Sequence, residues 1–479
     1  MKISYLFRGL VCSLAVVIAF CLALGLSFSD IGRAAPVSVH KSVQTVDPGK
    51  FIGAIPDWSA AEKIFPSQGS SKISIHLSCL TNTTATLTTP RCYSPQQFYN
   101  AYDVNGLLNS GNRGKGQTIV IIDASSSPSL QSDLHTYDQL FGLKDPRLNV
   151  IAPFGMPPTN NAFYVETALD VEMAHSMAPD ATIDLVLTGD TSKVQTVQSF
   201  FYDLLKAVKY AVDNNLGGSI SISYGDGESC VDNAFVQYEH SIFQEARDKA
   251  ISVFVSSGDQ GAAVGSCTSG FFLDKGVSFL SADPLVTSVG GTTLDATVGS
   301  GSYVSETTWD NTTSLLGASG GGFSTLFPRP DYQDGVAGIG TMRGLPDVSW
   351  DGDPLTGVPI VISSDGGFEV IPIGGTSAGA PAWGAFTALF NQYAGQRLGF
   401  LNEAFYRILK SNAYNKGFYD ITTGNNNFEG ITSKGKSFPV TGYHAGPGWD
   451  AATGLGTPKV NALAPLLKQY VHEGDGQGL

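Results

Sequence analysis

The chain has 479 residues, with 28 lysines and arginines against 42 aspartates and glutamates, which gives a formal net charge of −14 at pH 7. This balance argues against nucleic acid or an anionic membrane surface as a partner, because both repel negative charge. Many of these carboxylates would be neutral in acid, so the composition is compatible with stability at low pH.

The first 35 residues predict a secretory signal peptide. Two basic residues precede an apolar run of 17 residues at 10–26, and cleavage is expected after Ala34 because Pro36 makes the next bond an awkward site. The run also approaches the length of a membrane span, so an uncleaved N-terminal anchor is the alternative. After signal removal we expect a secreted protein, with no stable membrane association, that is a monomer.

The cysteines fit export to an oxidising compartment. Cys12 and Cys21 lie in the signal, and four others remain. Four cysteines allow three pairings, and the local one predicts the bridges Cys79 to Cys92 and Cys230 to Cys267. None of them forms a close CxxC pair, which argues against a metal site made of cysteines.

The sequence contains four strand-like runs, at 116–123, 181–187, 219–225 and 251–257, and helical segments lie between them. This alternation predicts an α/β fold in which a central parallel sheet carries helices on both faces. We expect one large domain at 92–471, preceded by a short N-terminal extension or reduced prosegment at 36–91 and followed by a tail at 472–479. The stretch at 423–442, rich in asparagine and glycine, is expected to be a long loop.

A helix that begins near Tyr164 carries two carboxylates. Its apolar residues Leu169 and Met173 recur at helical spacing, and Glu166 and Asp170 are four positions apart on one face. Like charges this close repel, so one partner tends to keep a proton, which makes the pair a candidate acid/base unit. The alternative is a solvated acidic helix face.

Two aspartates end strands. Asp123 follows the run at 116–122, and Asp259 follows the run at 251–257 in a Ser-Gly-Asp-Gln-Gly turn. The carboxyl ends of parallel strands are where α/β sheets build their sites. Aspartate is also an ordinary turn residue, which is the alternative for both positions.

The run GGTSAGAPAWGAF at 374–386 places Ser377 at the start of an apolar, small-residue helix. Glycines permit a tight turn there, and the turn would expose the serine hydroxyl beside helix-terminal N–H groups. Such a serine is a candidate nucleophile. The alternative is a plain helix N-cap, a position where serine is common.

Together these segments resemble the sedolisins, serine-carboxyl peptidases that share the subtilisin fold but replace its histidine. The resemblance rests on Glu166 and Asp170 in ETALDVE, on Asp259 in SSGDQG and on Ser377 in GGTSAGAP. It covers roughly residues 93–471 and includes four further segments: GKGQTIVIID, SISISYG, SGGGFS and RGLPDVSWDGDPLTG.

The resemblance implies a serine endopeptidase that hydrolyses unfolded polypeptides at acidic pH. Ser377 would be the nucleophile, Glu166 the general base with Asp170 behind it, and a protonated Asp259 the group that stabilises the oxyanion. A tripeptidyl-peptidase-type exopeptidase is one alternative. An inactive relative that keeps the fold and binds peptides is another.

Subtilisin itself is the closest rival, because a Gly-Thr-Ser element also marks its nucleophile. No His-Gly-Thr-His-like string occurs in this chain. His175 lies on the helix of Glu166 and Asp170, but it is five positions from Asp170, about 140° around the helix, so it should pack elsewhere. Asp123 stands where subtilisins carry their catalytic aspartate, and we interpret it as a strand-end or turn carboxylate, with a supporting role at the site as the alternative.

The resemblance also implies substrate-binding segments and one calcium ion. Glycine-rich backbone beside the site would pair with an extended peptide. Calcium favours carboxylate and carbonyl oxygens from irregular loops, here two aspartate side chains and three carbonyls. The predicted substrate-binding residues are Ser223, Tyr224, Gly225, Ser319, Gly320 and Gly321, and the predicted calcium ligands are Asp420, Ile421, Gly446, Gly448 and Asp450.

One departure from the sedolisin pattern concerns the N-terminal side of the domain. Sedolisins generally carry a long folded prodomain, whereas about 55 residues separate Ala35 from the segment CYSPQQFYNAYDV. Residues 36–91 are therefore expected to be a reduced prosegment, an extension of the mature enzyme or a surface arm.

Overall fold

The computed structural model describes residues 78–84, 90–191, 194, 196–268, 270–311, 316–364 and 367–475. The predicted signal, its two cysteines and most of the predicted N-terminal extension lie outside these residues. No helix in the described ranges combines the length and the apolar character needed to cross a bilayer.

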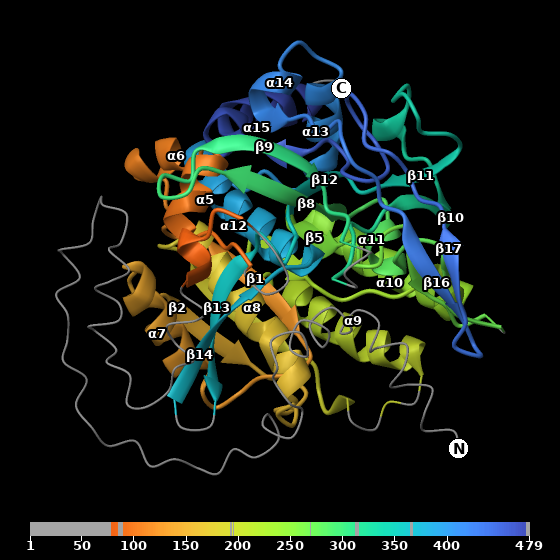
Figure 1. Ribbon diagram of the computed structural model, residues 1–479, viewed down its shortest axis with the longest axis horizontal. Coiled ribbons are helices and arrows are strands. Elements are labelled where there is room, and N and C mark those ends of the chain that lie inside the picture. Colours follow the sequence, from red (N-terminus) through yellow and green to blue (C-terminus); the bar gives the residue numbers. More distant parts are fainter. Residues whose placement is uncertain are drawn as a thin grey trace.

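A central eight-stranded sheet organises the molecule (Figure 1). Seven of its strands run parallel, and the eighth, β9, pairs antiparallel with β8. In sheet order the parallel strands are β12 (Val348–Asp351), β8 (Thr287–Ala296), β5 (Ser252–Ser256), β4 (Ser219–Ile222), β1 (Thr118–Asp123), β3 (Thr182–Leu187) and β2 (Arg147–Ile151), and β9 spans Tyr303–Thr308. The four strands expected from the sequence are neighbours in this sheet, which confirms the α/β prediction.

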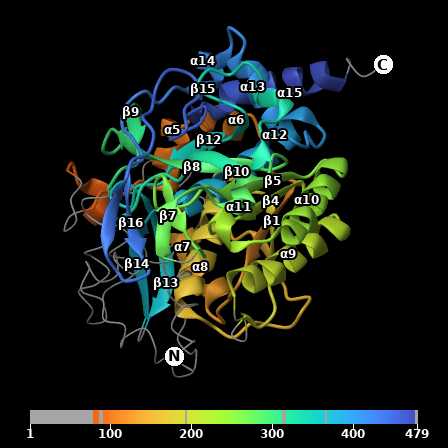
Figure 2. The ribbon, with the colours of Figure 1, turned by 90° about the vertical axis from the view of Figure 1, so that its right-hand side faces the viewer.

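Helices cover both faces of the sheet because successive strand residues alternate between the faces. In β1, Ile119 and Ile121 join the core that contains α8 (Asn161–Met177) and α12 (Thr376–Ala394). Val120 and Ile122 join the opposite core, with α9 (Val197–Asp213) and α10 (Asn233–Asp248). Helices α9 and α10 lie side by side (Figure 2). The run is apolar throughout because both of its faces are buried.

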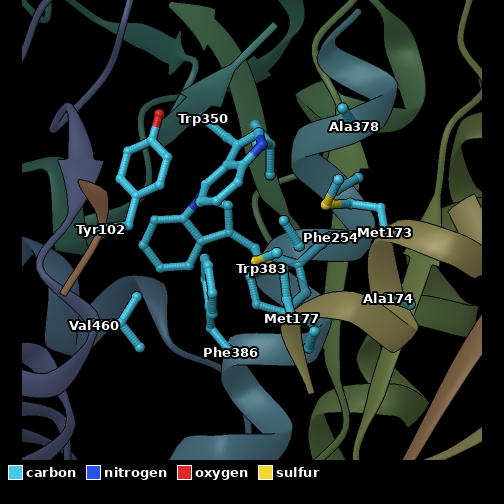
Figure 3. Packing of buried hydrophobic residues seen from close by; sticks show 14 of the residues in the cluster. Tyr102, Met173, Ala174, Met177, Phe254, Trp350, Ala378, Trp383, Phe386 and Val460 are labelled. Atoms are coloured by element: carbon cyan, nitrogen blue, oxygen red, sulfur yellow. The ribbon is translucent and has the colours of Figure 1, made fainter. Parts of the chain in front are cut away.

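In the core that contains α8 and α12, these two helices pack against each other and against the sheet. Met173 and Met177 of α8 approach the apolar side of α12 beside Phe254 of β5 (Figure 3). On α12, Trp383 is fully buried, and its indole N–H donates to the carbonyl of Ser349 at 3.0 Å. Buried aromatic side chains of this size contribute strongly to stability, and the satisfied N–H avoids a desolvation penalty. The two helices that carry the candidate catalytic residues are therefore one packed unit.

Shorter elements surround this framework. The remaining helices are α5 (Pro95–Ala101), α6 (Asn105–Asn109), α7 (Leu130–Phe141), α11 (Phe279–Ala282), α13 (Asn402–Leu409), α14 (Tyr414–Gly417) and α15 (Val460–Asp475). The remaining strands are β6 (Ala263–Gly265), β7 (Phe271–Lys275), β10 (Gly322–Pro328), β11 (Met342–Leu345), β13 (Val358–Ser364), β14 (Gly367–Ile373), β15 (Phe418–Tyr419), β16 (Phe428–Thr432), β17 (Ser437–Val440) and β18 (Thr457–Pro458). Helix α15 continues to Asp475, past the boundary at 471 that was expected for the tail.

The expectation of a long loop at 423–442 was wrong. Strands β16 and β17 form an antiparallel hairpin within this stretch, and β16 also pairs with β7. Asparagine and glycine are concentrated before the hairpin and at its turn. The composition of the stretch therefore indicated a loop, although it contains two short strands. The hairpin is stabilised by pairing with a strand more than 150 residues earlier in the sequence, a contact that no local pattern reports.

Both predicted disulfides are present. Cys79 pairs with Cys92, and Cys230 pairs with Cys267, closing sequence separations of 13 and 37 residues. The first ties the segment that enters the domain to residues just before α5. The second joins the short turn after β4 to the loop between β6 and β7. Each bridge restricts the unfolded chain and so stabilises the folded state.

Candidate active site

Ser377 lies at the beginning of α12, but it is not the helix N-cap. The N-cap is Gly375, with φ 118°, and Ser377 is the second residue of the helix. Only a glycine tolerates this conformation easily. The side chain of Ser377 is 8 % exposed, so the hydroxyl is more enclosed than the sequence suggested. The N-cap alternative is therefore wrong, and the hydroxyl is free to interact outside its own helix.

Pro381 leaves one backbone carbonyl in the first turn of α12 without its helical partner. In a regular helix the Ser377 carbonyl would accept the N–H of residue 381, but proline has no N–H. The Ser223 hydroxyl donates to that carbonyl instead, at 3.3 Å, and to Asp170 Oδ1 at 3.0 Å. Because the single Ser223 proton is shared between the two acceptors, this residue connects the backbone of Ser377 to Asp170 on α8.

Glu166 and Asp170 lie inside the molecule. They are 8 % and 0 % exposed, so the alternative of a solvated acidic face is wrong. Ser377 hydrogen-bonds to the Glu166 side chain and lowers its pKa. Asp170 Oδ2 has no hydrogen-bond partner in the described part of the chain. Glu166 is therefore the carboxyl of this pair that contacts Ser377, and Asp170 lies one helical turn further along α8.

A third carboxyl group, Asp123, belongs to the same cluster. It ends β1, is fully buried, and accepts a hydrogen bond of 2.6 Å from the Tyr224 hydroxyl. Its charge raises the pKa values of both Glu166 and Asp170. The predicted strand-end position of Asp123 is correct, and this electrostatic contact favours the alternative of a supporting role. The signal that could have found it is its place at the carboxyl end of a central strand.

Burial and mutual repulsion keep protons on this cluster. Burial, followed by the charges of Asp123 and Asp259, raises the pKa of Glu166 to about 8. Burial raises the pKa of Asp123 to about 7, and burial with the charges of Asp123 and Glu166 raises that of Asp170 well above its usual range. While its neighbours are protonated, ionisation of Glu166 is opposed only by burial and is favoured by Ser377. In acid the raised pKa values keep most of the cluster protonated, and protonated neighbours make Glu166 easier to ionise than charged ones would.

Asp259 contacts the residue before Ser377. Its Oδ1 accepts hydrogen bonds from both the N–H and the hydroxyl of Thr376, each at 2.8 Å. Its Oδ2 lies 2.9 Å from the point where a Cβ atom on Gly375 would stand, so only glycine leaves room for it. Burial raises the pKa of Asp259. Because Oδ1 already accepts two bonds, Oδ2 is the oxygen available to carry a proton.

His175 takes no part in this arrangement. It is fully buried, and its Nε2 lies 2.9 Å from Asp138 Oδ1, on the side of α8 that faces α7. The prediction that it packs elsewhere is confirmed. Across the described ranges no histidine hydrogen-bonds to Ser377.

Comparison with known proteins identifies the family, although no family model matches the chain. Kumamolisin of Bacillus sp. is 32 % identical over 397 residues, which span 79 % of this chain and 65 % of kumamolisin. The solved structure of Pseudomonas sedolisin, described as a serine-carboxyl proteinase, matches with a TM-score of 0.66 at 26 % identity, over 80 % of this chain and 99 % of that one. The chain belongs to the sedolisin family.

Another relative carries the name of an exopeptidase. Tripeptidyl-peptidase 1 of Canis lupus familiaris is 28 % identical over 350 residues, which span 70 % of this chain and 57 % of that protein. The chain thus spans less than two thirds of the length of the curated relatives it matches. The subtilisin-like fold is shared with the solved sedolisin structure.

The glycine-rich segments that the sedolisin resemblance assigned to substrate are packed against other loops. Ser319 is fully buried, and its hydroxyl donates to the Ala452 carbonyl at 2.7 Å. The N–H of Gly320 donates to the Gly258 carbonyl at 2.7 Å. Tyr224 is 8 % exposed and is turned toward Asp123. Pairing of substrate with residues 223–225 and 319–321 stays a prediction.

The predicted calcium ligands come together around one loop. The N–H of Gly448 donates to both Asp420 oxygens, at 3.0 and 3.1 Å, and the N–H of Gly446 donates to Asp450 Oδ2 at 3.1 Å. Loop 446–450 therefore brings the two carboxylates near each other. In the described ranges no cluster of three or more histidine, cysteine, aspartate or glutamate side chains is arranged to hold a metal, so a site here depends on backbone carbonyls.

Buried carboxyl groups also occur away from Ser377, and they predict greater stability in acid. Burial raises the pKa values of Asp226 and Glu306 to about 7, and burial with nearby negative charge raises that of Glu239 well above its usual range. A carboxyl whose folded pKa exceeds its unfolded pKa favours the folded state while it is protonated. That contribution is lost as pH rises from about 4 through about 7.

We therefore expect the melting temperature to be several degrees higher at pH 4 than at pH 7. Scanning calorimetry at matched ionic strength and calcium concentration would measure it. Glu239→Gln replaces a buried titratable carboxyl, whose two oxygens have no hydrogen-bond partner in the described structure, and should reduce the difference between the two melting temperatures. Equal melting temperatures at both pH values would contradict this expectation.

Proposed function

We propose that the chain is a secreted serine-carboxyl endopeptidase that hydrolyses peptide bonds of unfolded polypeptides in acid. The observation that carries the proposal is the contact between Ser377 and a buried Glu166, backed by Asp170 and with no histidine beside it in the described structure. A carboxyl group has an ordinary pKa below that of histidine, and in acid the protonated neighbours of Glu166 no longer add their repulsion to the burial that raises its pKa. The two disulfides support a secreted protein.

The proposed reaction begins with the cluster carrying one negative charge on Glu166. Glu166 takes the proton of the Ser377 hydroxyl as its oxygen attacks the scissile carbonyl carbon, and it returns that proton to the leaving amine. The product is an acyl group on Ser377, which water hydrolyses by the same steps in reverse. Protonated Asp170 and Asp123 leave the charge on Glu166, since ionising either of them would repel it.

Asp259 is proposed to stabilise the tetrahedral intermediate. Thr376 holds Oδ1 through two hydrogen bonds, which leaves a proton on Oδ2 to be donated to the oxyanion. The nearby beginning of α12 adds the positive end of a helix dipole. An ionised Asp259 would repel the oxyanion, so this arrangement requires acid.

Endopeptidase and exopeptidase action can be separated with paired peptides. An endopeptidase cleaves a peptide with an acetylated N-terminus as well as the same peptide with a free one. A tripeptidyl-peptidase, the activity that the name of one relative suggests, requires the free amine and releases three residues. Mass spectrometry of digests from pH 2 to pH 8 tests both functions. No cleavage of either peptide, with calcium present and residues 36–91 removed, would favour an inactive peptide-binding relative.

We also propose one calcium ion at loop 446–450. The chemistry of the residues fits such an ion, because Asp420 and Asp450 supply carboxylate oxygens and the loop that hydrogen-bonds to both adds backbone carbonyl oxygens. When bound, the ion would stabilise this loop rather than take part in the reaction. The proposed ligands are Asp420 and Asp450 through their side chains, with Ile421, Gly446 and Gly448 through their carbonyls.

Removal of calcium is expected to lower the melting temperature. A chelator should reduce it in the wild type, and added calcium should restore it by mass action. In Asp420→Asn both effects should shrink, because a carboxylate ligand is lost. A matched control is Asp295→Asn, an aspartate whose side chain is 54 % exposed and that lies outside this loop. A chelator effect of the same size in Asp420→Asn and the wild type would count against the site.

A further inference from the structure

A polar pocket lies at the end of the sheet opposite Ser377. Its volume is about 320 Å³, and it is bordered by the start of β1, by Gly218 before β4, and by the end of α12 with Arg397 just beyond. Ser377 begins α12 and Asn391 is 14 residues further along, which corresponds to about 21 Å of helix. No acidic residue lines this pocket, in a chain with 42 acidic residues.

Asn391 directs a hydrogen-bond donor into the pocket. Its side chain is 1 % exposed, and its Oδ1 accepts the N–H of Leu398 at 2.8 Å, which fixes which way the amide points. Its Nδ2 is buried and has no partner in the described structure. A buried donor left unpaired costs free energy, so a group that accepts from it would be stabilised there.

Arg397 contributes a positive charge at the same place. Its Nη1 donates to Asn215 Oδ1, and the described structure gives it no carboxylate partner. The point where a Cβ atom on Gly218 would stand lies 2.8 Å from Asn391 Nδ2 and 3.5 Å from Arg397 Nε. The two donors therefore converge above the bare Cα of Gly218. The backbone carbonyls of Asn391 and Gln392 at the end of α12 do not need these two side-chain donors, because they already accept the N–H of Gly395.

From this geometry we infer that the pocket binds a small oxyanion, a carboxylate or a phosphate, held by Asn391 Nδ2 and the Arg397 guanidinium over Gly218. An arginine beside an amide donor matches the paired oxygens of such groups. The site is separate from the proposed catalytic residues and does not depend on the proposed function.

The test is calorimetric titration of the full-length protein at pH 5.5 with acetate or with inorganic phosphate, at ionic strength matched with sodium chloride. We expect saturable binding of at least one anion, and the stronger of the two identifies the ligand class. Asn391→Asp keeps the acceptor for Leu398 but replaces the donor with an oxygen, and Arg397→Gln removes the charge. Each should weaken binding about 10-fold or more. Arg147→Gln, which removes an exposed arginine of β2, is the matched control and should bind as the wild type does.

Two results would overturn the inference. One is the absence of saturable binding in the wild type, which would mean that Asn391 Nδ2 is satisfied by water alone. The other is binding of equal strength in all four proteins, which would place the anion elsewhere. Circular dichroism of Asn391→Asp and Arg397→Gln separates lost binding from lost fold. If either variant does not fold, protection by phosphate of wild-type amide protons at Gly218 and Leu398 against hydrogen exchange decides the question.

Discussion

Ser377→Ala and Glu166→Gln are each expected to abolish peptide hydrolysis, with losses of about 10⁴-fold or more in kcat. The first removes the oxygen that we propose as the nucleophile. The second keeps the size of the side chain but cannot accept the serine proton, since an amide is not a base at these pH values. The two changes should not add, because the residues act on one proton transfer. Initial rates on an unfolded protein in acid provide the measurement.

A matched control for this experiment lies on the same helix. Glu172 is also buried in α8, but it accepts the N–H of Val361 at 2.9 Å and does not contact Ser377. Glu172→Gln should therefore keep most of the activity. If Glu166→Gln and Glu172→Gln reduced the rate equally, the loss would reflect disturbance of a buried helix, and Glu166 would not be the base.

Asp259→Ala is expected to lower kcat about 10²–10³-fold, the usual cost of removing one donor to an oxyanion. The pH dependence separates this role from a purely structural one. A protonated Asp259 donates and an ionised one repels, so wild-type activity should fall as pH rises through its pKa, which burial raises above the ordinary range. Asp259→Asn places an amide donor where Oδ2 stands, and that donor does not titrate.

The comparison of the two Asp259 variants is the informative measurement. Asp259→Asn should retain more activity than Asp259→Ala, and its decline toward neutral pH should be shallower than that of the wild type. Melting temperatures for all three proteins control for stability, because Oδ1 also holds Thr376. Identical pH profiles in the wild type and Asp259→Asn would show that another group causes the decline.

Much of the site could be predicted from the sequence because its residues lie in local patterns. Glu166 and Asp170 are related by helical spacing, Asp259 follows an apolar strand, and Ser377 lies between glycines and a helix. Each pattern left a plain alternative open, and burial excluded the solvated acidic face for Glu166 and Asp170. The parallel sheet could be predicted from four apolar runs of strand length, because parallel strands that are buried on both faces are apolar on both faces.

Other features depend on contacts that no local pattern records. Tyr224 donates to Asp123 across 101 positions, and the charge of Asp123 raises the pKa values of Glu166 and Asp170, so a strand-end aspartate belongs to the acidic cluster. The hairpin at 428–440 forms where composition suggested a loop, because β16 also pairs with β7. The pair of hydrogen-bond donors in the pocket at the end of α12 could not be predicted either. Asn391 and Arg397 are residue types that are common on surfaces, and no local pattern shows that Gly218 lies beside them.

The packing of α8 against α12 has a consequence for how the protein loses activity on heating. Enzymes that carry their reactive groups on mobile loops can be inactivated by local melting well before the rest of the structure unfolds. Here Glu166 and Ser377 are carried by two helices that share the main hydrophobic core, and their separation is set by that core. Inactivation should therefore coincide with cooperative unfolding of the whole domain. The shelf life of the protein in acid would then be governed by its global unfolding rate.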